Sequence, residues 1–147
     1  MELKAFLQEN TVFLDGGMGT LLQAQGLPLG ELPERWNCTH PNAVQSVHKA
    51  YFDAGSHVVS TNTFGANELK LESDKYTLQE LVKSAVDNAK KAIEITGKKQ
   101  GEDVYIGLSI GPSGKLLKPL GDLDFSDAVD AFKKTISVGA QSGADLV

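Results

Sequence analysis

Short apolar runs alternate with longer amphipathic stretches along this chain, and the alternation constrains its fold more than any other feature. The runs at 11–14, 57–60, 103–109 and 144–147 are apolar and rich in residues that favour strands. Between them, apolar residues recur at the three- and four-residue spacing of helices. Strands that alternate with helices in this way are typical of parallel sheets with crossover helices. The sequence therefore predicts an α/β fold.

Helices are predicted wherever the helical spacing is sustained and a residue that ends helices follows. The predicted helices span residues 1–9, 41–54, about 78–95 and about 126–142. Pro41 suits the first turn of a helix because its missing N–H would be unpaired there anyway. Gly55 is well placed as the left-handed residue that ends the same helix. The Gly- and Pro-containing segments 26–36 and 111–114 are predicted to be a loop and a turn.

Two architectures fit this order of elements, an open doubly wound sheet and a (β/α)8 barrel. A complete barrel usually needs about 250 residues. The 147 residues of this chain would supply roughly half of one and stop as a fourth apolar strand begins. We therefore expect residues 1–147 to form a single domain, the first half of a TIM-type barrel truncated at its fourth strand, with no second domain.

The charge balance and the lack of long apolar runs exclude two classes of partner. The chain has 14 Lys and Arg against 19 Asp and Glu, a formal net charge of −5, and no basic cluster. A phosphate-rich nucleic acid would be repelled by such a protein. No apolar run is long enough for a signal peptide or a membrane span. A cytoplasmic protein that binds neither nucleic acid nor membrane is the simplest expectation.

Polar and glycine-rich segments follow three of the predicted strands. The segments are Asp15 to Thr20, Thr61 to Asn67, and Gly111 to Gly114. Ligands of parallel α/β folds bind at the carboxyl ends of the strands, so all three segments should open onto one face. Asp15 could hold a substrate ammonium group or act as a base there. An aspartate before glycine also commonly bonds its own backbone in a turn, and the spacing favours neither interpretation.

The remaining residues at these strand ends also leave alternatives open. Gly16 and Gly17 would let the backbone come close to a ligand. The polar run from Thr61 to Thr63 could bond a substrate carboxylate, or could satisfy the backbone of its own loop. The glycines match neither common phosphate-binding motif. A stand-alone α/β module that binds a phosphorylated or amino-acid ligand at 15–20 is nevertheless an alternative.

The sequence offers no metal-ligand motif. The single cysteine, Cys38, excludes an intrachain disulfide and a cysteine-rich metal site within the chain. A small buried side chain is a better interpretation of Cys38 than a nucleophile or ligand. The three histidines have no metal-ligand spacing, and His48 falls on the apolar face of a predicted helix, where a packed histidine is expected.

Four motifs in order resemble the homocysteine S-methyltransferase domain family. The first is Leu14-Asp15-Gly16-Gly17-Met18-Gly19-Thr20, and the second runs from Asn37 and Pro41 through the helix to Gly55. The third is Thr61-Asn62-Thr63-Phe64-Gly65-Ala66-Asn67, and the fourth is Ile110-Gly111-Pro112-Ser113-Gly114. Within the family, the likeness is greatest to the N-terminal domain of cobalamin-dependent methionine synthases. The resemblance extends from about Phe13 to Val147.

This resemblance implies a (β/α)8 barrel that binds homocysteine at the carboxyl ends of its strands. Asp15 would lie near the amino group of the substrate, and Gly16 and Gly17 would approach it closely. Thr61, Asn62, Thr63 and Phe64 would line the same pocket. We expect no residue of this chain to be catalytic by itself.

The resemblance also implies cofactors and partners outside this sequence. A zinc ion would activate the homocysteine thiol, but its three cysteine ligands would all come from the second half of the barrel. This chain alone is therefore expected to bind no metal and to be inactive. Cobalamin and methyltetrahydrofolate would bind other domains of the full protein. The expected partners are homocysteine, the other half of the barrel and the downstream domains, or a second copy paired through the open edge.

Overall fold

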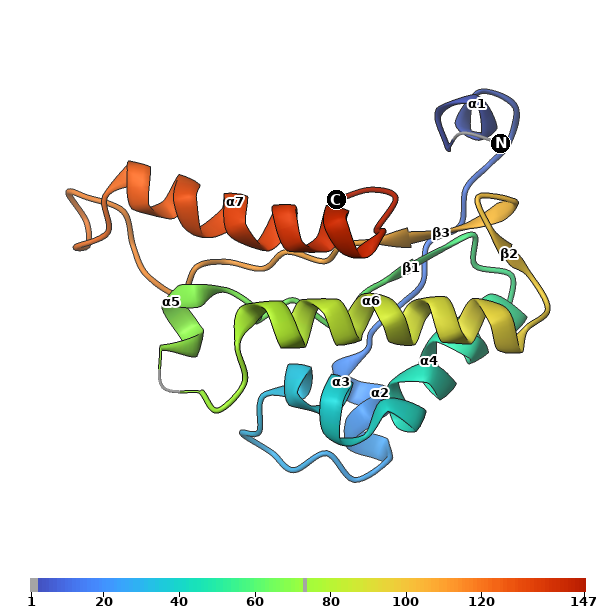
Figure 1. Cartoon of the computed structure of the whole chain (residues 1–147), viewed down its shortest axis with the longest axis horizontal. Helices are drawn as coiled ribbons and strands as arrows, with labels where there is room; N and C mark the ends of the chain where they lie inside the picture. The colour runs from blue at the N-terminus through green and yellow to red at the C-terminus, as the bar shows by residue number, and fades with distance from the viewer. Residues whose placement is uncertain (1–2, 73) are drawn as a thin grey trace.

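The computed structural model describes residues 3–72 and 74–147 of the chain, and it is an α/β structure (Figure 1). The strands are β1 (Val58–Ser60), β2 (Lys99–Gln100) and β3 (Asp103–Gly107). The helices are α1 (Leu3–Glu9), α2 (Gly19–Ala24), α3 (Trp36–Thr39), α4 (Pro41–Asp53), α5 (Glu68–Leu71), α6 (Leu78–Ile95) and α7 (Phe125–Ser142). A short 3-10 helix, Pro33–Arg35, precedes α3. None of the described helices is long and apolar enough to cross a membrane.

The sheet is parallel, as the alternation of elements predicts. β1 pairs with β3, and Ser60 lies opposite Gly107. Leu14 bridges to β1 and Leu146 bridges to β3, both in parallel. The four predicted strand segments therefore lie side by side in chain order. An open doubly wound sheet reverses its order at a switch point, and these segments show no such reversal.

Two predicted strands are shorter than expected, and β2 was not predicted, nor were the short helices α2, α3 and α5. The segments 11–14 and 144–147 each contribute a single bridge instead of a full strand. Each lies at an edge of the described sheet and has only one neighbouring strand to pair with. β2 pairs in parallel with the start of β3, although the polar sequence Lys99–Gln100 carries no strand signal.

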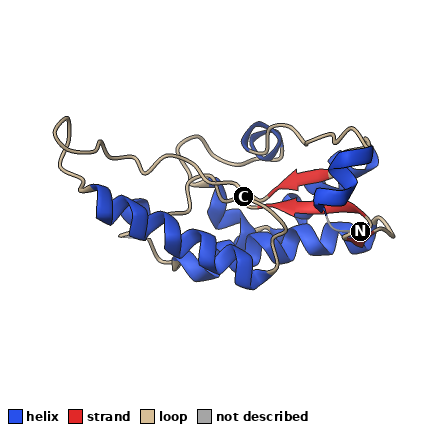
Figure 2. Cartoon of the chain, turned by 90° about the horizontal axis from the view of Figure 1, so that it is seen from above, coloured by secondary structure: helices blue, strands red, loops and turns tan. Residues whose placement is uncertain are grey.

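The long helices α4, α6 and α7 lie next to one another on one side of the strands (Figures 1 and 2). α6 packs between α4 and α7. Val59 and Ile106 point from the sheet into this helical layer, where they pack with Ala89 and Ile93 of α6. Because alternate residues of a strand face opposite sides, Val58 and Tyr105 face away from these helices.

The helix ends agree with the local sequence signals. α6 has the predicted bounds, and Thr77 and Glu80 form a reciprocal capping box at its start. Pro41 is the first residue of α4, as predicted. Gly143 adopts a φ of +96° directly after α7, a left-handed conformation that glycine adopts without a steric penalty. α7 begins at Phe125, one residue before the predicted start.

The sheet face opposite the long helices is only partly covered. Phe6 of α1 packs against Val58 and Tyr105, and its ring centroid lies 5.8 Å from that of Tyr105. Leu14 bridges to Val58, so it lies on this face, and it remains largely exposed. One side of the sheet therefore has a complete apolar core, and the other side leaves an apolar side chain open to solvent.

Two loop predictions need correction. The segment 26–36 is not irregular throughout, because it contains the 3-10 helix Pro33–Arg35 and the first residue of α3. The segment 111–114 leads into a bend at 114–115 without a backbone hydrogen-bonded turn, and such a turn lies at 118–120. There the Gly121 N–H donates to the carbonyl of Leu117. Pro and Gly marked these as irregular regions, but they did not show where the chain reverses.

Candidate functional site

A cleft of about 530 Å³ opens where β1 and β3 end. Gly16 and the residues from Thr61 to Phe64 line it, together with Glu34 and Ser109. Asp15 and Gly17, which were also predicted for the site, adjoin the lining in sequence but do not form part of it. None of the described residues that line the cleft is Lys, Arg or His.

Asp15 is hydrogen-bonded directly to Ser60, the last residue of β1. Its carboxylate accepts hydrogen bonds from the Ser60 N–H at 2.7 Å and from the Ser60 hydroxyl at 2.9 Å. Burial raises the pKa of Asp15 above its usual value, and the two bonds from Ser60 act in the opposite direction. Asp15 therefore lies beside the polar run that begins at Thr61, so the predicted proximity of these two segments is confirmed.

Tyr51 of α4, which was not among the predicted site residues, hydrogen-bonds to the glycine segment that follows Asp15. The Tyr51 hydroxyl on α4 donates to the carbonyl of Gly17 at 2.9 Å. A Cβ at Gly16 would lie only 2.8 Å from that hydroxyl oxygen. Glycine is therefore required at position 16 because the backbone packs closely against Tyr51 of α4. This reason adds to the predicted one, which was that glycine lets the backbone come close to a ligand.

Thr61 and Thr63 form a closed ring of hydrogen bonds with Ser109. The Ser109 N–H donates to Thr61 Oγ1 at 3.1 Å, and Thr63 Oγ1 donates to the Ser109 carbonyl at 2.7 Å. The two threonine hydroxyls are 2.7 Å apart. Only donation from Thr61 to Thr63 satisfies all three bonds, because the Thr63 proton is already used. Both hydroxyls thus join the ends of β1 and β3, in agreement with the alternative that this loop bonds its own surroundings.

Asn62 belongs to a buried amide network behind the cleft. Its side-chain NH2 donates to the carbonyl of Pro33 at 2.9 Å and to Asn37 Oδ1 at 3.0 Å. Asn37 donates back to the Asn62 carbonyl at 2.8 Å, and Asn88 of α6 donates to the Asn37 carbonyl at 3.0 Å. These bonds fix the loop before α3 against the chain that follows β1.

Phe64 forms part of the apolar wall of the cleft, together with Met18 and Leu32. Its side chain is 60% exposed, although its backbone is closely packed. A Cβ at Gly111 would lie 2.2 Å from the Phe64 carbonyl oxygen and 2.9 Å from its ring. Glycine is therefore required at 111 so that the segment after β3 can pass directly beside Phe64.

Glu34 was missed by sequence reasoning and is the most buried charged residue described. Its side chain is 3% exposed, and one carboxylate oxygen accepts a hydrogen bond from the Gly65 N–H. The other oxygen, Oε2, is buried without a hydrogen-bond partner in the described part of the chain. Burial raises the pKa of Glu34. The segment 26–36 was predicted as a loop, and loops carry no periodicity that would identify a buried acid.

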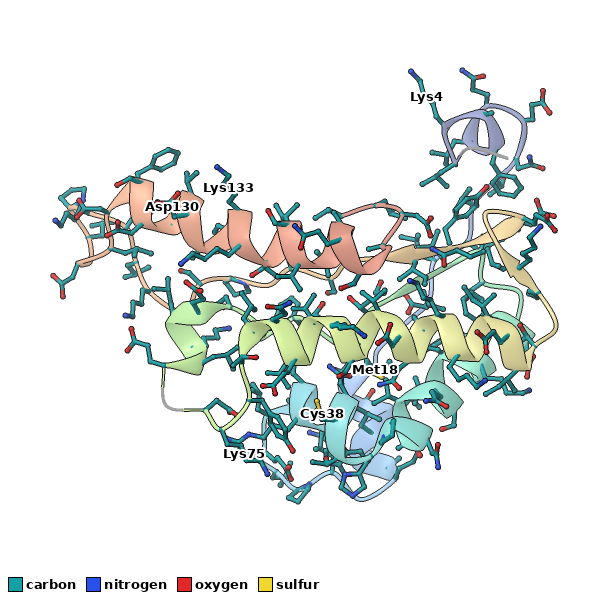
Figure 3. All side chains as sticks on the ribbon, viewed as in Figure 1. Lys4, Met18, Cys38, Lys75, Asp130 and Lys133 are labelled. Atoms are coloured by element: carbon teal, nitrogen blue, oxygen red, sulfur yellow. The ribbon has the colours of Figure 1, made fainter. Side chains whose placement is uncertain are left out.

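Within residues 3–72 and 74–147, no three His, Cys, Asp or Glu side chains gather as metal ligands would. Cys38 lies on α3 next to α6 (Figure 3), and its sulfur is 3.5 Å from the Ser84 hydroxyl. It packs beside a cluster of buried apolar residues that includes Leu81. The side chain is half-buried and has a packing role, close to the interpretation favoured from the sequence.

Comparison with known proteins confirms the family that the motifs resemble. A family model for homocysteine S-methyltransferase matches residues 12–147. The methionine synthase of Mycobacterium tuberculosis strain H37Rv is 29% identical over 154 aligned positions, which cover 99% of this chain and 13% of that protein.

Solved structures of the homocysteine methyltransferase MmuM from Escherichia coli are similar in fold. The metallated form gives a TM-score of 0.82 at 22% identity, covering 99% of this chain and 56% of that one. The oxidized form gives 0.79 at 24% identity, covering 99% and 55%. The chain thus spans just over half the length of MmuM and a much smaller share of the methionine synthase.

At these sequence identities the similarity to MmuM shows only that the folds are alike. The family model carries the assignment, because it matches nearly the whole chain and includes every strand end that contributes to the cleft. The chain belongs to the homocysteine S-methyltransferase family.

Proposed function

We propose that this chain is the first half of a (β/α)8 barrel and that its cleft binds homocysteine for methyl transfer to sulfur. One observation carries the proposal: the segments after two different strands, at Gly16 and at Thr61 to Phe64, line the same cleft in a chain of this family. Ligand sites of (β/α)8 barrels lie at this end of the strands.

The arrangement of the sheet supports the half-barrel. Its four segments follow one another in chain order, and the long helices cover a single face. In a closed barrel the opposite face is filled by side chains from all the strands. The exposed side chain of Leu14 would then be covered by the second half, and the chain spans 56% of the metallated MmuM chain. A second copy paired at the open edge remains the alternative partner.

The residues around the cleft suit an amino acid with an apolar side chain. The Asp15 carboxylate would attract the ammonium group, and the backbone N–H groups of the glycines after it would bind the carboxylate. The exposed ring of Phe64 would pack against the methylene carbons. Thr61 and Thr63 would contribute by fixing the wall instead of bonding the substrate, because their hydroxyls already bond to each other and to Ser109.

Zinc chemistry would have to come from residues outside this sequence. A free thiol with a pKa of about 8.5 is mostly protonated at neutral pH, and metal coordination removes that proton. The described residues of this chain do not fit a zinc site. We therefore assign this chain the task of holding and orienting homocysteine, and no step at the metal. Cobalamin and methyltetrahydrofolate as methyl carriers, and a cytoplasmic location, stay predictions.

The alternative of a phosphate-binding module is disfavoured by the charge of the cleft. Glu34 lines it and Asp15 lies next to it, whereas no basic side chain is among its described lining residues. A phosphate dianion would meet two acidic groups and no cation there.

Titration calorimetry with homocysteine and with inorganic phosphate tests this function. We expect homocysteine to bind, phosphate not to bind, and Asp15→Asn to weaken homocysteine binding about tenfold. Asparagine can keep both bonds to Ser60, because the serine hydroxyl can accept from its amide. Asp87→Asn, at an exposed position on α6, is the matched control. Phosphate binding without homocysteine binding would overturn the proposal.

A further inference from the structure

Glu34 Oε2 is the one polar side-chain atom described in the cleft wall that is buried without a partner. Its companion oxygen accepts from the Gly65 N–H, so the residue's structural contact uses only half of the carboxyl group. A buried acceptor with no donor is costly, and such groups in native proteins usually point to a missing ligand, ion or water.

Most of the other polar side chains around the cleft already form hydrogen bonds within the protein. Both oxygens of Asp15 accept from Ser60. The Thr61 and Thr63 hydroxyls complete the ring with Ser109, and both Asn62 amide protons are donated to other residues. Among the described lining residues, the buried side-chain acceptor left for a ligand donor is therefore Glu34 Oε2.

Lys70, the positive charge that acts on Glu34, does not fill this role. Lys70 influences Glu34 through space, but this effect is the smallest of those that act on the carboxyl. Burial is the largest influence and raises the pKa of Glu34, so it outweighs the opposing effects of the Gly65 bond and of Lys70. The chemistry that would compensate it is a cationic N–H donor.

We propose that Glu34 Oε2 accepts a hydrogen bond from the α-ammonium group of the amino acid held in the cleft. This assignment rests on the proposed function and adds a second carboxylate to the one at Asp15. The oxygen is shielded from water in the ligand-free protein. The terminal torsion of a glutamate is broad, so a small rotation of the carboxyl can bring the oxygen to the ligand.

The test removes the carboxylate charge and the ligand's amino group independently. Binding of homocysteine and of 4-mercaptobutanoic acid, which lacks only the amino group, is measured by calorimetry for the wild-type chain and for Glu34→Gln. Glutamine can still accept from the Gly65 N–H, so the loop contact is kept. Glu72→Gln removes the same charge at an exposed position outside the cleft and serves as the control.

We expect Glu34→Gln to weaken homocysteine binding about 10- to 100-fold and to leave 4-mercaptobutanoic acid binding within about threefold of wild type. Equal weakening of both ligands, or no change in either, would overturn the assignment and leave Glu34 only its contact with Gly65. Failure of the wild-type chain to bind either ligand would instead refute the proposed function, and the assignment with it.

A second measurement needs no substitution, so it tests the role of Glu34 even if Glu34→Gln does not fold. The ¹³C signal of the Glu34 carboxyl carbon is followed in the wild-type chain during titration with each ligand. Homocysteine should move it toward the ionised form, because the ammonium group stabilises the carboxylate. The same shift with 4-mercaptobutanoic acid, or none with saturating homocysteine, would contradict the proposal.

Discussion

His48 should make the stability of this protein depend on pH below neutrality. Its side chain is fully buried on α4, and neither ring nitrogen has a hydrogen-bond partner among the described residues. Burial lowers the pKa of His48 from 6.5 to about 4, with no other contribution. The folded protein therefore holds this imidazole neutral at a pH where the unfolded chain would protonate it.

The sign and size of the effect follow from proton linkage. Between pH 6.5 and about 4 the unfolded state binds one more proton than the folded state, so stability falls as the pH falls. The contribution is fully present above pH 6.5 and exhausted below about pH 4. At about 1.4 kcal/mol per pH unit, it amounts to about 3 kcal/mol of unfolding free energy.

Several carboxyl groups also make the stability depend on pH, so a variant is needed to isolate the contribution of His48. Asp15 and Glu34 have raised pKa values, and their contributions are lost as the pH rises through those values. Asp74 bonds to Arg35, which lowers its pKa, so its contribution is lost as the pH falls. The difference between wild type and His48→Leu cancels these three terms and keeps the histidine term.

Urea unfolding between pH 4 and 7 measures this difference. The fluorescence of Trp36, the single tryptophan, and far-UV circular dichroism serve as two probes whose transitions should coincide. We expect the unfolding free energy of wild type, relative to that of His48→Leu, to fall by about 3 kcal/mol from pH 7 to pH 4. Val44→Ala, another fully buried site on α4, should shift stability equally at every pH. Parallel curves for wild type and His48→Leu would refute the reasoning.

Four further predictions follow from the contacts around the cleft. Thr63→Val should cost about 1–3 kcal/mol in urea unfolding, because it leaves buried partners of the hydrogen-bonded ring unpaired, whereas Thr63→Ser should cost less. Gly111→Ala should cost about 1–3 kcal/mol and weaken homocysteine binding, because its Cβ would meet the Phe64 carbonyl. Tyr51→Phe should cost about 1 kcal/mol by removing the bond to Gly17, and wild-type stability would contradict it. Zinc titration of the chain should reveal no tight stoichiometric site, and a tight one would contradict the assignment of the ligands to other residues.

The local sequence predicted the elements better than it predicted the site. The helix from Leu78 to Ile95 has the predicted bounds because its periodicity, start and end are all encoded within a few turns. The edge segment at 11–14 follows the strand pattern, but its pairing depends on a neighbour more than forty positions away. The propensity of a segment does not determine how many of its residues pair.

The site shows the same division between local and long-range information. Asp15 and Thr61 stood out because each directly follows an apolar run. Glu34 and Tyr51 did not, because their partners Gly65 and Gly17 are 31 and 34 positions away in sequence. Glu34 lies in none of the four motifs, and Tyr51 lies within the second one only as a residue of the helix. The folded chain shows that both hold backbone groups at the cleft.

Each contact that forms the cleft connects neighbouring segments of the sheet. The cleft walls therefore depend only on segments that this chain contains. Asp15 joins the first segment to the end of β1 through Ser60, and the threonine ring joins the end of β1 to the segment after β3. None of these bonds requires a strand beyond β3. The walls of the cleft are therefore formed locally, and closure of a barrel would complete the site without having to create it. For the function proposed above, the shape of the substrate pocket and the supply of a metal would therefore be separable. The chain would hold an amino acid and depend on other residues for the chemistry at sulfur.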